Sequence, residues 1–203
     1  MIRKNLLNCN LIQLKNLTKS LFNGFMVSFQ PETEVCSFCN CKGRCRIHGY
    51  YERSIIDFSD GSVIYNSIHI PRVLCTGCRH THAILPDPII PYSTYSLLFI
   101  LQVLNTYFNH SLTIVVLCER FQIVPAMLYR WIKLFRKHRQ EWQGILSFQE
   151  QSDASFLSDL FRNSPYCSFA SSFTKLTSVS FLQSHRNPSS SKRSNSPPDS
   201  ILG

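Results

Sequence analysis

The sequence predicts an α+β protein, in which a small β module is followed by three helices and a flexible tail. Two Cys-x-x-C pairs, at residues 36–39 and 75–78, flank a stretch that carries a hairpin signal. Apolar residues then recur at helical spacing from residue 93 to residue 147. The remaining residues, 148–203, contain 16 serines, a composition typical of flexible chain. The order of these features predicts β structure first and helices second.

Residues 1–30 predict a weakly basic, helical leader. Its apolar residues recur at helical spacing but are interrupted by asparagine, glutamine and lysine, and no small-residue cleavage site follows, so we expect no signal peptide. The longest apolar run, Leu97 to Leu104, is far shorter than the roughly 20 residues of a spanning helix. The sequence therefore predicts a cytoplasmic protein that does not enter a membrane.

Residues 31–92 predict short strands and turns. Pro31 begins this module, and a group of prolines between residues 86 and 91 closes it. Asp60-Gly61 lies between two β-branched runs, which is a strong signal for a two-residue hairpin turn. The strand after the turn leads into the second cysteine pair, so the predicted hairpin brings the two pairs together.

The cysteine pairs predict a zinc ribbon with one structural Zn²⁺ per chain. Zinc prefers a tetrahedron of soft ligands, and each Cys-x-x-C turn presents two thiolates to one side of the ion. An odd total of nine cysteines, without a secretory signal, favours metal over disulfides. Four sulfur ligands leave no open position for water, so the metal is expected to fold the module and not to catalyse. The predicted ligands are Cys36, Cys39, Cys75 and Cys78.

Alternative ligands lie close to the first pair. Cys41, Cys45 or His48 can replace Cys39 or contribute to a second, partial site. The remaining histidines of this module, together with His48, are expected to be polar surface groups, because four cysteines already satisfy a zinc ion; these are His69, His80 and His82.

Residues 93–147 predict a three-helix module of the helix-turn-helix type. Ser93 or Thr94 is the expected cap of a first helix that is apolar on nearly all sides, so this helix is either buried or an interface for self-association or a transposase. Thr113 is the expected cap of a second helix, and Pro125 suits the first residue of a third that ends near His138.

The third helix has an apolar face and a basic face. Its apolar residues are spaced to pack on the preceding helix and turn, and no acidic residue lies between positions 121 and 140. A helix that reads DNA needs both faces, one to anchor it and one to meet the groove and its phosphates. We expect Arg130 to be the best candidate for a bidentate contact to guanine. The predicted DNA contacts are Ala126, Met127, Tyr129, Arg130, Lys133, Arg136 and Lys137.

Residues 148–203 predict a Ser-rich, largely disordered tail. One short helix is expected within it, around the apolar group Phe156, Leu157, Leu160 and Phe161.

Several segments between residues 35 and 143 resemble a family of uncharacterised bacterial proteins. That family combines a zinc ribbon with a helix-turn-helix and is related to the N-terminal, DNA-binding part of insertion-sequence transposases. The resemblance implies cysteine-bound zinc, DNA binding through the helix that Pro125 opens, and a mobile-element context. It implies no enzyme, because the RNase H-like core of such transposases and its three carboxylates are not recognisable here. The residues that carry the resemblance are Cys36-Ser-Phe-Cys39, Arg44 to Arg53, Arg72 to Cys78, Leu117 to Phe121, and Tyr129-Arg130-Trp131.

The net charge of +9 indicates a partner that carries phosphate. With the basic helix, it predicts a non-catalytic, zinc-containing DNA-binding protein of a bacterial mobile element, associated with the nucleoid when bound. The alternative is a zinc-ribbon adaptor that binds a larger transposase or polymerase. An RNA-binding role is favoured less, because few exposed aromatic residues are expected for stacking bases. An enzyme is favoured least, since no catalytic motif is recognisable.

Overall fold

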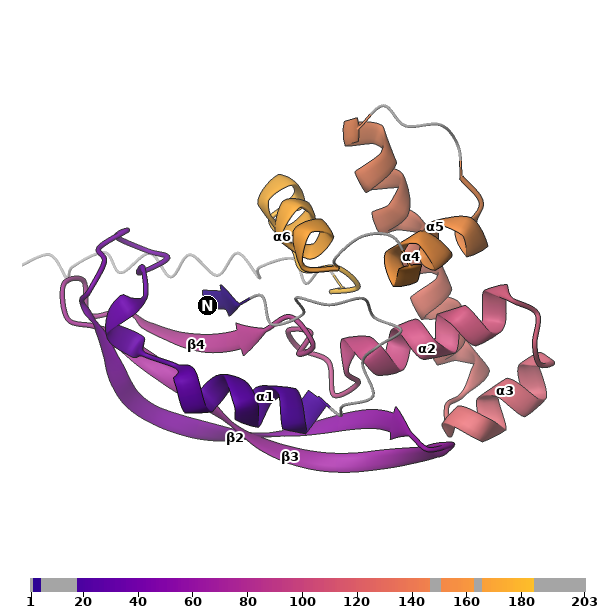
Figure 1. Cartoon of the computed structure of the whole chain (residues 1–203), viewed down its shortest axis with the longest axis horizontal. Coiled ribbons are helices and arrows are strands. Elements are labelled where there is room, and N and C mark those ends of the chain that lie inside the picture. The colour runs from indigo at the N-terminus through magenta and orange to yellow at the C-terminus, as the bar shows by residue number, and fades with distance from the viewer. Residues whose placement is uncertain (1, 5–17, 147–150, 163–165, 185–203) are drawn as a thin grey trace, which may run out of the picture.

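A computed structural model describes residues 2–4, 18–146, 151–162 and 166–184 (Figure 1). The fold is α+β. Three antiparallel strands form the sheet, in the order β4-β3-β2, and a short strand β1 pairs with β4 in parallel. The described strands are β1 (Ile2–Lys4), β2 (Cys45–Ser59), β3 (Ser62–Cys75) and β4 (Thr81–Pro86). The described helices are α1 (Thr18–Ser28), the short 3-10 helix η2 (Pro31–Thr33), α2 (Leu97–Phe108), α3 (Ile114–Phe121), α4 (Pro125–Leu146), α5 (Asp153–Arg162) and α6 (Tyr166–Thr177).

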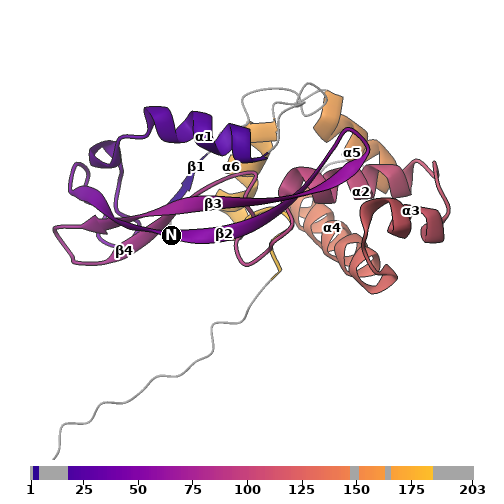
Figure 2. The ribbon, with the colours of Figure 1, turned by 90° about the horizontal axis from the view of Figure 1, so that it is seen from below.

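The hairpin of β2 and β3 turns at Asp60-Gly61, as predicted. Both residues have a positive φ, 52° and 79°, and Ser59 pairs directly with Ser62. A two-residue loop with two positive φ angles is the turn that Asp-Gly favours. The strands are not short, however: β2 has 15 residues and β3 has 14. The hairpin is long enough to join the cysteine end of the molecule to the helices, as Figure 2 shows.

The leader is only partly helical. Strand β1 lies at residues 2–4 and helix α1 begins at Thr18, whereas residues 5–17 lie outside the described part of the chain. Helix α1 covers one face of the sheet (Figure 2). Asp57 of β2 fixes the start of α1, because its carboxylate accepts bonds of 2.9 and 2.7 Å from the backbone N–H and the hydroxyl of Thr18. Phe22 of α1 is buried with the isoleucines of the sheet.

Helix α2 is the buried helix of the molecule. Its cap is Ser96, whose hydroxyl accepts a 3.0 Å bond from the N–H of Phe99, and so the helix begins later than the predicted caps Ser93 and Thr94 allow. Seven of its twelve residues are buried, so those side chains are not available for self-association. Within the described residues, no helix has both the length and the hydropathy needed to cross a membrane.

The helices share a core with the tip of the hairpin. The rings of Phe58 on β2 and Phe121 on α3 are 4.5 Å apart, and the guanidinium of Arg120 lies 5.6 Å from the Phe58 ring. Residues near the turn also pack against the buried face of α2 and α4. The predicted boundary near residue 92 therefore separates two segments of sequence that pack together in space.

The C-terminal segment differs from its prediction. Helix α5 confirms the expected short helix, but a further helix, α6, follows, and both pack into the largest core. Helix α4 also continues to Leu146, beyond the predicted end near His138. The prediction of a largely disordered tail is wrong for residues 151–162 and 166–184, because apolar side chains of both segments are buried, among them Phe156, Leu160, Phe169 and Phe173. Residues 147–150, 163–165 and 185–203 lie outside the described part.

Candidate metal centre and helix pair

The two cysteine loops have the same backbone geometry. In the first loop, the N–H of Asn40 donates to the carbonyl of Cys36, and the N–H of Cys36 donates to the carbonyl of Cys41. The second loop repeats both bonds at the equivalent positions around Cys75. The residue after the second cysteine of each pair has a positive φ, 58° at Asn40 and 64° at Arg79. This repeated turn aims both thiols of each loop at one point.

Four sulfur atoms meet between the loops. All four Sγ atoms lie within 4.8 Å of one another, with 3.6 Å between Cys36 and Cys78 and 3.7 Å between Cys39 and Cys75. These distances are too long for a disulfide, whose S–S bond is about 2.05 Å. Four sulfurs at about 2.3 Å from a tetrahedral metal are about 3.8 Å apart. The predicted ligands are therefore brought together in an arrangement that can hold a metal ion.

The thiols of the four cysteines differ in acidity. Burial opposes the ionisation of Cys36, but the amides of its own loop and the side chain of His82 outweigh burial and lower its pKa to about 5. Hydrogen bonds from backbone amides of the second loop are the main cause that lowers the pKa of the Cys75 thiol. In Cys39 and Cys78 a backbone hydrogen bond also favours the thiolate, but burial and the adjacent thiols raise the pKa. Thiolates this close together repel one another, and a bound divalent cation would offset that repulsion. The donor set therefore fits a thiolate-binding metal.

His82 supports the sulfur group and was missed in the sequence. Its Nε2 lies 3.1 Å from the Sγ of Cys36, and its Nδ1 lies 3.2 Å from the hydroxyl of Ser37. The prediction of a surface group is wrong for His82, which is only 5% exposed. The sequence signal for its burial is the alternation of side chains along a strand, which places His82 on the same side of β4 as the buried Ile84. His48, His69 and His80 are exposed, as predicted, and His80 stacks on Phe38.

The alternative ligands lie outside the four-sulfur group. Cys41 and His48 are exposed. Cys45 is buried directly across the strand pair from Cys75, and burial is the first cause that raises the pKa of its thiol. Cys45 therefore packs behind the group as a small apolar side chain.

Helices α3 and α4 are joined by a tight turn. The hydroxyl of Thr113 accepts a bond from the N–H of Val116, which confirms the predicted cap, and Pro125 is the first residue of α4, also as predicted. Gln122 has a left-handed backbone, and the N–H of Ile123 donates to the carbonyl of Cys118. This pattern ends a helix and reverses the chain within three residues. The face of α4 that packs inward contains Leu128, Trp131, Ile132 and Phe135.

Six of the seven predicted contact residues are exposed, and Met127 is half-buried against Tyr95. Two of the exposed residues have neighbours from other elements: Arg136 is bound to Asp153 of α5 at 2.6 Å, and Arg130 lines a cavity. Lys137 lies 3.7 Å from Glu141 of its own helix. The remaining exposed residues, together with Lys137, are called the exposed stripe of α4 below: Ala126, Tyr129, Lys133 and Lys137.

Residues 36–131 match the model of a family described as a domain of unknown function (DUF6431). The matched segment begins at the first cysteine of the sulfur group and ends within α4, so it includes all four sulfur ligand candidates and the whole of α3. No curated protein and no solved structure matches the chain.

Proposed function

We propose that the chain is a non-catalytic DNA-binding protein, held together at one end by a structural Zn²⁺ ion, and that it is related to the DNA-binding part of mobile-element transposases. The observation that carries the proposal is the exposed stripe of α4, which follows a capped helix and a tight turn as in a helix-turn-helix. The sequence resemblance described above supports the mobile-element context.

Zinc is the metal that the sulfur group suits best. Four thiol ligands from two Cys-x-x-C loops are typical of structural zinc sites, and such a site leaves no position for a catalytic water. The residues that would hold the ion are Cys36, Cys39, Cys75 and Cys78. In the hydrophobic cluster around the group, the other buried residues are Cys45, Val73 and Ile84, so the metal would supply stability that this small cluster lacks. On this proposal the cysteine end is a zinc ribbon.

The His82→Ala variant is expected to bind zinc about 10-fold to 100-fold more weakly, because His82 holds the Cys36 sulfur in position. The measurement is a competition titration with a chromophoric chelator. His69→Ala is the matched control, since His69 is exposed on β3. Equal zinc affinity in both variants would show that His82 does not support the metal.

The exposed stripe of α4 supports contact with a nucleic-acid duplex. Lys133 lies at its centre, one turn from Tyr129 and one turn from Lys137, and all three are exposed. Among the described residues, the start of α4 carries no acidic group to repel phosphate. Exposed basic residues of the sulfur-bearing end, Arg44, Arg46, Arg72 and Arg79, add positive charge to the same chain.

Lys133→Ala is expected to weaken binding to duplex DNA about tenfold near 0.1 M salt and to reduce the slope of log K against log salt by about one, because one phosphate contact is lost. Fluorescence anisotropy at several salt concentrations measures both quantities. Lys175→Ala, an exposed lysine of α6, is the matched control and should change neither. An identical salt slope in wild type and Lys133→Ala would contradict the role given to α4.

A protein-binding adaptor is the second candidate, and one surface feature favours it. Val115 and Val116 of α3 are 66% and 45% exposed, and Val124 before α4 is 58% exposed. Exposed apolar side chains are typical of protein interfaces where they form a contiguous patch. Association with a transposase or polymerase that is insensitive to salt, with no measurable affinity for DNA, would favour the adaptor over the DNA-binding protein.

A further inference from the structure

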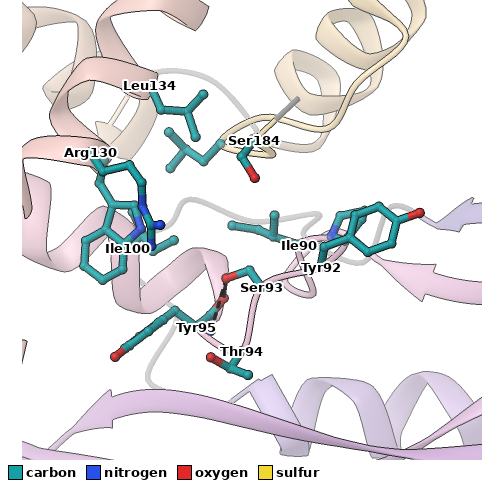
Figure 3. A pocket seen from close by; sticks show the side chains of 12 residues that line it. Ile90, Tyr92, Ser93, Thr94, Tyr95, Ile100, Arg130, Leu134 and Ser184 are labelled. Carbon is teal, nitrogen blue, oxygen red and sulfur yellow. Dashed lines mark hydrogen bonds between the residues drawn. The ribbon is translucent and has the colours of Figure 1, made fainter. Parts of the chain in front are cut away.

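A cavity lies beside α4 (Figure 3). Its volume is about 350 Å³, within the range of pockets that hold small organic molecules. Its described lining comes from four parts of the chain. Residues 90–95 lead from the sheet to α2, and Ile100 belongs to α2 itself. Arg130, Trp131 and Leu134 come from α4, and Leu182 and Ser184 follow α6.

The cavity wall combines one cation with apolar side chains. Among the described residues that line it, Arg130 is the one charged side chain and none is acidic. The ion pairs of the described part of the chain involve other basic residues of α4, Arg136, Lys137 and Arg139. The apolar part of the wall consists of Ile90, Pro91, Ile100, Trp131, Leu134 and Leu182.

Polar groups stand opposite the guanidinium. Figure 3 shows Arg130 on one side of the cavity and Ser184 on the other, with Ser93 below them, whereas the ring of Tyr92 points away. The hydroxyl of Ser93 is already used, because it donates to the carbonyl of Tyr95 at 2.9 Å and accepts from the N–H of that residue. Arg130 and Ser184 are donors that can meet a ligand, and Thr94 also lines the cavity with a hydroxyl group.

Hydrogen bonds from strand β2 hold the loop at residues 90–95 that lines the cavity. The guanidinium of Arg53 on β2 donates to the carbonyls of Ile90 and Ser93, and the second bond is 2.6 Å long. Ser96, just after the loop, pairs its backbone N–H with Ile56 of the same strand. A loop fixed in this way keeps its shape without a ligand, which lowers the entropy cost of binding.

We propose that this cavity binds a small organic anion, in which a carboxylate or phosphate group meets Arg130 and an apolar body lies against Trp131 and its apolar neighbours. A guanidinium suits both kinds of anion, because its planar N–H groups form paired bonds to two oxygens. None of the four cysteines of the metal centre and none of the four residues of the exposed stripe lines this cavity, so the proposal goes beyond the proposed function.

The test measures binding of four probes by isothermal titration calorimetry: benzoate, phenyl phosphate, inorganic phosphate and neutral benzyl alcohol. We expect saturable binding of benzoate or phenyl phosphate, and their relative affinities separate a carboxylate site from a phosphate-ester site. Inorganic phosphate lacks the apolar body and benzyl alcohol lacks the charge, so both should bind at least tenfold more weakly. Fluorescence of Trp131 in a Trp142→Phe background gives a second readout at the site, because the chain has two tryptophans.

Two variants that each remove one positive charge locate the binding. Arg130→Gln should weaken binding of the preferred anion about tenfold or more, since a charged hydrogen bond is lost. Lys175→Gln removes the same charge from an exposed position on α6 outside the cavity and should leave the affinity unchanged. No saturable binding of either organic anion, equal binding of benzyl alcohol, or unchanged affinity in Arg130→Gln would each overturn the proposal.

Discussion

The double variant Cys75→Ser, Cys78→Ser is expected to lose its zinc and to unfold the cysteine end of the molecule. Structural zinc sites contribute roughly 10–16 kcal/mol of apparent binding free energy to the folding of small modules, which equals or exceeds the whole stability of a typical domain. The wild type should contain one zinc per chain by metal analysis. Hydrogen exchange should show loss of protection in residues 34–52 and 70–84, and a strong chelator should have the same effect on the wild type.

Cys41→Ser is the matched control for this prediction. Cys41 is exposed in the first loop and lies outside the four-sulfur group, so this variant should keep the zinc and the protection. The same control tests the alternative in which Cys41 replaces Cys39 as a ligand. A double variant that stays fully folded and a wild type that contains no metal would together refute the structural metal site.

Phe173→Ala is expected to destabilise the protein by about 3–5 kcal/mol, the usual cost of removing a fully buried aromatic ring. Phe173 of α6 is 0% exposed, and its ring lies 5.0 Å from that of His138 and 5.5 Å from that of Phe181. Urea denaturation followed by circular dichroism measures the change in the free energy of unfolding. A loss of this size would show that α6 is packed in the core, although the composition of residues 148–203 predicts disorder.

Leu176→Ala provides the control in the same helix. Leu176 is 51% exposed, so its truncation should change the free energy of unfolding by less than about 1 kcal/mol. Equal, small effects of both substitutions would mean that α6 does not dock on α4 in solution. The docking also uses the backbone, since the N–H of Leu182 donates a 3.0 Å bond to the Nδ1 of buried His138.

The tail shows how composition misled the prediction. A count of serines over residues 148–203 gives no weight to the spacing of the phenylalanines and leucines within the described segments 151–162 and 166–184. These residues include Phe156, Leu160, Phe169 and Phe173, all buried. Their helical spacing predicts a buried face, but only the partner surface on α2 and α4 makes burial favourable. The partner is distant in sequence, so composition alone did not reveal it.

The predicted DNA contacts show a similar limit. Helical spacing correctly separated the buried face of α4 from its polar face, because that separation depends on local geometry. It did not separate residues within the polar face. Asp153 of α5 binds Arg136, and the loop before α2 makes Arg130 part of a cavity. Asp153 belongs to the predicted tail, and the loop spans the predicted boundary between residues 92 and 93.

The sequence by itself determined the features that depend on nearby residues: the four cysteines in two matching loops, the turn at Asp60-Gly61, the cap at Thr113 and the helix start at Pro125. Each follows from the conformational preference or spacing of a few adjacent residues. Only the tertiary structure decided that His82 supports a sulfur, that Arg130 faces a cavity and that α6 enters the core. These depend on which distant segments pack together, because burial and hydrogen bonding are fixed by partners that the local sequence does not specify.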